Sequence, residues 1–422
     1  MDLRSRLAQL ESKLGLDARE RQGPPFVDGQ AAVSVAARLQ RLAAAQGDVP
    51  HRKAILPEAI AVLLRGALCA DGVVLIEQSL PATQSHGRIA FSSLRDVPLT
   101  FLAGGEEPCR EGLLFIDTET TGLAGGTGTV AFVLGLSRME GAFVRVRQYF
   151  LLKFGAEAAM LAHALDWIHG ATHLVSFNGK SFDVPLLVTR YRLARLEDHL
   201  QKLPHIDLLH RTRAAFRRNW PDCRLQTAEQ HLLALYRDND TPGHLIPQMW
   251  TDFLRGGETR GLRGIVEHNC TDLLSLIALA CVLGRTYAAP AQYGADPLGV
   301  ARAHRRVGDD ATALMHLRDH DDVLSNDAQL ELAALYARSG QWQDAVDIWE
   351  TLGDRGVIRA MERLAKYHEH RRGDFAAALR WTERMCAGSA SVGPIDRRRQ
   401  RLLSRQNASA ARCTLSLPSA TP

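Results

Sequence analysis

The stretch Phe115-Ile-Asp-Thr-Glu-Thr-Thr-Gly122 decides the fold, because an apolar run ends there in two carboxylates. Residues 113–116 have the length and composition of a buried strand, and Asp117 and Glu119 stand at its end. Side chains alternate along a strand, so both carboxylates point to the same side, and a divalent cation such as Mg²⁺ or Mn²⁺ is the obvious partner for them. The alternative for an isolated Asp-x-Glu is a solvated strand end with two capping residues.

The residues around this stretch predict an α/β domain. Apolar runs at 130–136, 144–152 and 174–177 have strand character, residues 157–168 have helical periodicity, and further helices follow to about residue 288. Three strands, a helix, another strand and more helices is the order of a ribonuclease H-like core, a mixed sheet flanked by helices. We therefore expect this domain over residues 111–288. Residues 1–110 form an N-terminal region, partly linker, to which the sequence assigns no fold.

The chain after Pro290 repeats itself. A glycine is followed five residues later by an alanine at Gly308, Gly340 and Gly373, and these glycines are 32 and 33 positions apart. This spacing resembles the tetratricopeptide period, with glycine at a helix–helix turn and alanine where two helices approach closely. We expect an all-α helical-repeat domain over residues 291–388, with an unrelated bundle of helical hairpins as the alternative. Residues 389–422 are expected to be a disordered tail.

Two later segments carry further polar groups at suggestive positions. Asn178 stands just past a predicted strand, and Asp183 follows five residues later near the start of a helix. His268 and Asp272 are one helical turn apart and therefore face the same way. Singly each motif is weak, since an asparagine there is usually a cap and a His–Asp pair usually a surface pair. Together with Asp117 they can form a site with a metal pair and a base.

Length and composition limit the class of protein. With 422 residues, 46% hydrophobic and 23% charged, the chain has the composition of a globular protein and is too long for one usual domain. It shows neither a run of 18 uncharged apolar residues nor a secretory signal at its start, which predicts a cytoplasmic protein without a membrane partner. The net charge of +4 neither demands nor excludes nucleic acid.

In combination, these motifs resemble the DEDD superfamily of DnaQ-like 3′–5′ exonucleases. The first motif matches at Asp117 and Glu119, the second at Asn178 and Asp183, and the third at His268 and Asp272. Within that superfamily the sequence is most similar to the YprB-type ribonuclease H-like branch, through the stretches at residues 117–126, 177–187 and 205–209.

The resemblance implies two-metal hydrolysis of phosphodiester bonds, most simply from the 3′ end of a single strand of DNA or RNA. Two Mg²⁺ or Mn²⁺ ions would be bound by four carboxylates, with one ion activating water and the other stabilising the leaving 3′-oxygen. The residues this implies are Asp117, Glu119, Asp183 and Asp272 as catalytic metal ligands, His268 as the catalytic base, and Thr118, Asn178 and Lys180 as substrate contacts. Lys180 is equally well a solvated surface lysine.

One departure from the superfamily pattern concerns His268. Members with histidine usually place it five residues before the last aspartate, whereas the spacing of four found here belongs to members with tyrosine. The metal ligands are unaffected, but the reach of His268 to the attacking water is in doubt. An endonuclease on the same fold and a non-catalytic adaptor that acts through its helical repeats are the alternative functions. In each case residues 291–388 are a candidate site for a protein partner.

Two further features have two readings each. Asp207, in an apolar run, either supports the acidic site from behind or caps the next helix. Arginines between residues 211 and 224 are interleaved with Phe216 and Trp220, which suits either a single-strand track or an amphipathic helix with its aromatic residues in the core. We expect a negatively charged pocket formed by the acidic residues beside a row of positively charged side chains.

Overall fold

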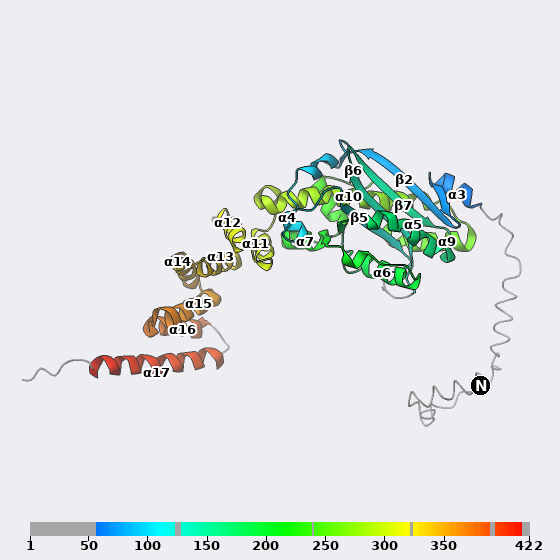
Figure 1. The fold of residues 1–422 in the computed structure, drawn as a ribbon. Coiled ribbons are helices and arrows are strands. Elements are labelled where there is room, and N and C mark those ends of the chain that lie inside the picture. Colours follow the sequence, from blue (N-terminus) through cyan, green and yellow to red (C-terminus); the bar gives the residue numbers. More distant parts are fainter. Residues whose placement is uncertain (1–55, 123–127, 239, 321–323, 389–392, 416–422) are drawn as a thin grey trace, which may run out of the picture. The chain divides into compact units, whose positions relative to one another are not determined.

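The computed structural model describes residues 56–122, 128–238, 240–320, 324–388 and 393–415 (Figure 1). Ile55–Pro422 forms one compact unit. The part of the N-terminal region before residue 56 and the last residues of the expected tail lie outside the described residues.

The main sheet has seven strands among the described residues, in the order β1-β2-β7-β6-β5-β8-β9. Strands β8 and β9 run parallel to β5, and the other neighbouring strands pair antiparallel. The mixed sheet flanked by helices confirms the expected ribonuclease H-like α/β fold. Its strands are β1 Ala67–Ala70, β2 Val73–Pro81, β5 Leu113–Thr120, β6 Ala131–Glu140, β7 Phe143–Leu151, β8 His173–Ser176 and β9 His205–Asp207, and a small second sheet holds β3 Ser85–His86 and β4 Ile89–Ala90.

Helices cover both faces of this sheet and continue beyond it. Their bounds in the α/β part are α3 Pro57–Leu63, η1 Phe91–Arg95, α4 Thr100–Ala103, η2 Phe154–Ala156, α5 Glu157–His169, α6 Asp183–Leu193, η3 Leu200–Lys202, α7 Leu208–Phe216, α8 Leu225–Ala228, η4 Glu229–Leu233, η5 Gly243–Leu245, α9 Ile246–Gly256 and α10 Leu262–Ala288. Those that follow are η6 Pro290–Tyr293, α11 Pro297–Arg306, α12 Asp310–Arg318, α13 Asn326–Arg338, α14 Trp342–Asp354, α15 Ile358–Tyr367, η8 His368–Arg372, α16 Phe375–Gly388 and α17 Gly393–Leu415.

Strand β5 lies between two hydrophobic cores, which explains its continuous apolar run. Leu114 and Ile116 pack into the core that contains α5 and α9, whereas Leu113 and Phe115 pack into the core that contains α7 and most of α10. Because both faces are buried up to residue 116, the chain becomes partly exposed only at Asp117. The two carboxylates therefore stand where the strand leaves the core.

The predicted boundary at residue 110 is not a boundary of the fold. Strand β2 pairs with β7 along its whole length, from Val73 opposite Leu151 to Pro81 opposite Phe143, and β1 adds a further strand. Residues 57–110 are thus part of the α/β domain. The alternation expected of a strand is weak here, because the buried residues of β2 lie in its first half and its second half alternates only between exposed and half-buried positions.

Helix α10 packs across β5, β6 and β7 (Figure 1). In the part of the chain that the structure describes, it is the one helix long and apolar enough to cross a membrane by length and composition. However, 78% of its most apolar window is buried inside the protein, so the helix has the burial of a core helix.

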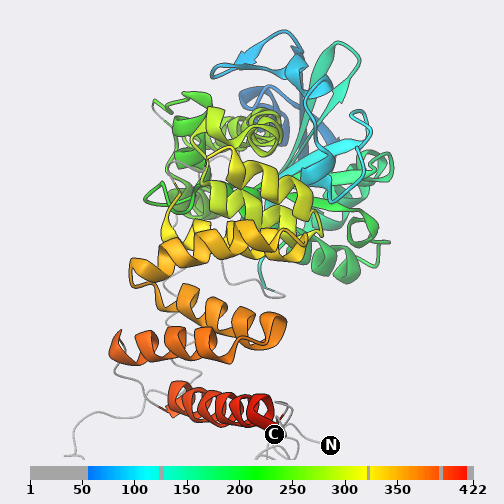
Figure 2. The ribbon, with the colours of Figure 1, turned by 90° about the vertical axis from the view of Figure 1, so that its left-hand side faces the viewer.

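The helices after residue 296 form successive antiparallel hairpins (Figure 2). Gly308, Gly340 and Gly373 each stand at a helix–helix turn with positive φ, and the alanines five residues later, Ala313, Ala345 and Ala378, are fully buried. Gly373 lies six residues after Tyr367, whereas Gly340 lies four residues after Tyr336, and the two extra residues fall in the π-helical turn η8. The helical C-terminal region is confirmed, while its assignment as tetratricopeptide-like stays a prediction.

The expected disordered tail is wrong over residues 393–415, where α17 forms a helix. Leu402 of α17 is fully buried and joins the small core of α16. The arginine-rich composition concealed this contact, because Arg401 and Arg405 pair with the buried Glu369 of the neighbouring hairpin.

Candidate catalytic site

Four carboxylates from three elements meet at one edge of the sheet. Asp117 and Glu119 belong to β5, Asp183 begins α6, and Asp272 lies on α10. The parallel pairing of Phe115 with Val175 aligns the carboxyl ends of β5 and β8, so the chain that leaves β8 reaches α6 beside Asp117. The structure therefore brings the predicted acidic residues together.

When ionised, these carboxylates repel one another. Burial, followed by repulsion from Asp272 and the other acids, holds the pKa of Asp117 and that of Glu119 well above their usual values. Burial likewise raises the pKa of Asp272, and it raises that of Asp183 to about 6. Such a cluster is stabilised by a positive charge placed among its oxygens.

Each of three carboxylates has a protein partner. Asn269 donates to Asp117 Oδ2 at 2.7 Å, Thr118 donates its hydroxyl to Asp183 Oδ1 at 2.5 Å, and Arg237 donates to Asp272 Oδ1 at 2.5 Å. With the side chains turned this way, no group of three or more acidic, histidine or cysteine side chains in the described part of the chain is arranged to hold a metal ion. The chemistry of the set nevertheless fits hard divalent ions, since the converging groups are carboxylates that repel one another.

Asn269 fixes Asp117 through a buried amide network. Its Oδ1 accepts from Gln148 Nε2 at 2.8 Å, so its Nδ2 must face Asp117. Gly135 makes room for this contact, since it pairs with Asp117 in the sheet and a Cβ there would lie 2.2 Å from Asn269 Oδ1. A glycine in β6 thus lets α10 approach β5.

His268 is oriented by an aspartate that the motifs did not include. Its Nδ1 lies 2.8 Å from Asp240 Oδ1, and its Nε2 lies 3.8 Å from Asp272 Oδ2. Burial opposes ionisation of Asp240, but hydrogen bonds from His268 and Arg237 outweigh it and lower the pKa of Asp240. An ionised carboxylate only accepts, so Nδ1 carries a proton, and Nε2 is the ring nitrogen that faces the carboxylate cluster.

Arg237 joins the site to a buried acid behind it. The guanidinium pairs with Glu229, Asp240 and Asp272, and the side chain of Glu229 is fully buried. Ser275 of α10 donates to Glu229 Oε1 at 2.5 Å and is itself 2.8 Å from His86 Nε2 of β3. His86, from the region before residue 110 to which the sequence assigned no fold, therefore contacts the residues that support the site.

Asp207 caps α7 and also holds the turn between β8 and α6. It caps α7 by accepting the N–H of Leu209 at 3.1 Å, and it accepts the N–H of Asn178 at 2.9 Å and of Lys180 at 3.1 Å. These contacts hold Asn178 in its positive-φ conformation of 72° at the turn between β8 and α6. The side chain of Lys180 is exposed beside this turn.

The aromatic residues of the arginine-rich stretch belong to the core. Phe216 is fully buried, and Trp220 stacks between it and His231, with ring centroids 4.2 and 4.7 Å apart. Both rings pack against other side chains of the protein, as the interpretation with the aromatic residues in the core expects, although Trp220 follows the end of α7 at Phe216.

The functional residues that the motifs missed are Asn269, Asp240, Arg237 and Glu229. Asn269 carried a signal, because it occupies an inward position of the apolar pattern Leu262, Ile265, Val266 and Leu273. The other three carried none, since the partners that connect them to α10 lie 28, 35 and 46 residues away: His268 for Asp240, Asp272 for Arg237 and Ser275 for Glu229.

Residues 114–283 match the RNase_H superfamily. The chain is 33% identical over 338 residues to the uncharacterized protein YprB of Bacillus subtilis (strain 168), an alignment that covers 75% of this chain and 81% of YprB. It is also similar to the family B DNA polymerase of the archaeon Pyrobaculum calidifontis, with 14% identity and a TM-score of 0.35, over 56% of this chain and 30% of the polymerase chain.

Proposed function

We propose that this chain, which belongs to the YprB-type branch of the ribonuclease H-like superfamily, is a metal-dependent 3′–5′ exonuclease that acts on DNA or RNA ends. Membership of this superfamily supports a nuclease. The observation that carries the finer proposal is the convergence of Asp117, Glu119, Asp183 and Asp272, whose charges repel one another.

The metal ligands would be these four carboxylates. Two divalent ions, Mg²⁺ or Mn²⁺, would supply an activated water and would offset the charge that develops on the phosphoryl and leaving oxygens. Thr118 and Asn269 hold two of the carboxylates in place from behind. The substrate contacts in this proposal are Thr118 and, on the turn fixed by Asp207, Asn178 and Lys180.

The general base in this proposal is His268. Its Nε2 faces the cluster, and Asp240 on Nδ1 would stabilise the imidazolium that forms when a neutral ring takes a proton from water at Nε2. The spacing of four to Asp272 is compatible with this role because the side-chain rotation is set by Asp240.

The test is hydrolysis by the purified full chain of 5′-labelled DNA and RNA strands, with Mn²⁺, with Mg²⁺ and with chelator. A metal-dependent ladder that shortens from the 3′ end is expected. Asp117→Asn should reduce the rate by about a thousandfold or more, whereas Asp71→Asn, at an exposed surface position, should leave it unchanged.

Other products would contradict the proposal in different ways. Discrete internal fragments would indicate an endonuclease on this fold. Absence of any metal-dependent product from single strands, duplexes and hybrids would refute a nuclease. Equal activity of Asp117→Asn and the unaltered chain would refute this site.

A further inference from the structure

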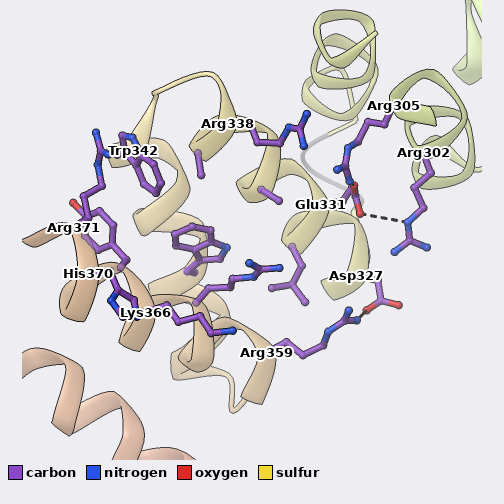
Figure 3. A pocket seen from close by; sticks show the side chains of 16 residues that line it. Arg302, Arg305, Asp327, Glu331, Arg338, Trp342, Arg359, Lys366, His370 and Arg371 are labelled. Carbon is purple, nitrogen blue, oxygen red and sulfur yellow. Dashed lines mark hydrogen bonds and ion pairs between the residues drawn. The ribbon is translucent and has the colours of Figure 1, made fainter. Parts of the chain in front are cut away.

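A groove on the helical hairpins lies apart from the carboxylate cluster. Its volume is about 860 Å³, and α11, α13, α14, α15 and η8 supply its lining (Figure 3). None of the proposed catalytic residues belongs to this lining.

The groove is strongly basic. Seven arginine and lysine side chains line it against two acidic ones, Asp327 and Glu331. Glu331 pairs with Arg302 and Arg305, and Asp327 pairs with Arg359 at 3.5 Å. The Asp327–Arg359 pair is solvent-exposed and therefore weak, so an anionic ligand can compete for Arg359. Arg363 and Arg371 are further exposed cations of the lining. The excess positive charge suits a polyanion.

Aromatic faces accompany the cations. Trp342 stacks on Tyr367 with ring centroids 5.7 Å apart, and the Arg371 guanidinium lies 4.2 Å above the Trp342 ring. Arg371 is an exposed side chain, so an unpaired base can replace it on the face of Trp342, a contact that an acidic peptide without rings would not make.

One buried donor in the groove lacks an acceptor. Trp349 lines the groove and is 4% exposed, and within the described part of the chain its indole N–H has no hydrogen-bond partner. A buried unpaired donor costs free energy. The N–H itself is covered, so an acceptor oxygen of a ligand reaches it only when the side chains around it move aside.

We propose that this groove binds single-stranded nucleic acid, with its arginines on phosphates and its aromatic side chains against bases. The groove would hold a strand independently of the carboxylate cluster. It therefore adds a second contact with nucleic acid to the proposed hydrolytic site.

The test measures binding of a fluorescent oligothymidylate of about 20 nucleotides by anisotropy. The full chain carries Asp117→Asn and is kept in chelator, so that no strand is cleaved. Arg363→Glu with Arg371→Glu, both exposed in the groove, should weaken binding about tenfold or more. The slope of the logarithm of the binding constant against the logarithm of the salt concentration should become shallower by about 0.7 for each phosphate that no longer meets a cation.

A matched control separates the groove from general charge. Arg355→Glu with Arg380→Glu changes the same charge at exposed positions of the same hairpins outside the groove, and should alter binding by less than about twofold. Circular dichroism of each variant verifies folding.

Three results would overturn the proposal. These are no binding of the oligothymidylate, equal weakening by both double variants, and tighter binding of a polyglutamate peptide through the same groove arginines. The proposed hydrolysis fails separately, because groove-dependent binding without any cleavage would remove only the nuclease proposal.

Discussion

His268 and Asp240 form a pair in which Nδ1 of the imidazole lies 2.8 Å from Oδ1 of the carboxylate, and this pair turns Nε2 toward Asp272. The two residues are 28 positions apart and come from α10 and from the chain between η4 and η5. Asp240 is thus a positioning residue for the proposed base.

Replacing Asp240 should impair catalysis more than binding. An amide at this position can hold the ring in the wrong tautomer and cannot stabilise the imidazolium, so Asp240→Asn should lower kcat about 10- to 100-fold with little change in KM. It should also shift the acidic limb of the pH profile, which a purely structural loss would not do. The exposed Asp238→Asn is the control. An unchanged kcat would remove Asp240 from this role.

Removing Arg237 should destabilise the fold. Arg237→Gln leaves Glu229 buried without its counter-ion, which should cost about 3–5 kcal/mol in the free energy of unfolding measured with denaturant. Adding Glu229→Gln should recover part of this loss, because it removes the stranded charge. Arg384→Gln, which breaks the exposed pair with Asp354, should cost about 1 kcal/mol or less. Strictly additive effects of the two buried substitutions would contradict this pairing.

The acidic cluster should make stability depend on pH in the chelated protein. The pKa of Asp183 is about 6 in the folded chain against an ordinary value of 3.8, so the folded state binds the proton more tightly and loses stability as pH rises from about 4 to 6. Asp183→Asn should therefore be more stable by about 1–2 kcal/mol above pH 6 and nearly neutral at pH 4.

Thermal unfolding in chelator at pH 4, 5, 6 and 8 measures this difference. Asp238→Asn, at an exposed position, should show no such pH-dependent gain. A loss of stability in Asp183→Asn that grows with pH would show that the ionised carboxylate is favoured in the fold, contrary to the expectation.

Gly135 should tolerate no side chain. The Cβ of Gly135→Ala would lie 2.2 Å from Asn269 Oδ1 and 2.8 Å from Leu273, so α10 must move away from β5 and β6. We expect a loss of about 1–3 kcal/mol in stability and a weaker hold on Asp117. Gly155→Ala, where nothing lies within 4 Å of the added Cβ, should be nearly neutral. Equal stability of the two variants in denaturant would contradict the tight approach of α10.

Local patterns were sufficient for the central elements. The run that ends at Asp117 is apolar because both faces of β5 are buried, and the helix predicted at 157–168 appears as α5. The carboxylates of β5, α6 and α10 were found because the superfamily motifs lie within short stretches of chain. The glycine turns of the hairpins were likewise readable, since glycine tolerates positive φ.

Contacts between distant segments could not be predicted from the sequence pattern. Strand β2 joins the sheet beside β7, about 70 residues later, and neither strand's own pattern specifies this pairing. The same holds for α17, which becomes ordered through contacts with Glu369 and α16.

The sequence by itself, through the superfamily motifs, identified the carboxylates that converge in the structure, because each motif lies within a short stretch of one strand or helix. Only the tertiary structure decided how those side chains are held. Gln148 orients Asn269, Asp240 orients His268 and Arg237 bridges three acids through side-chain hydrogen bonds, and such bonds depend on distances in space rather than on separation along the chain.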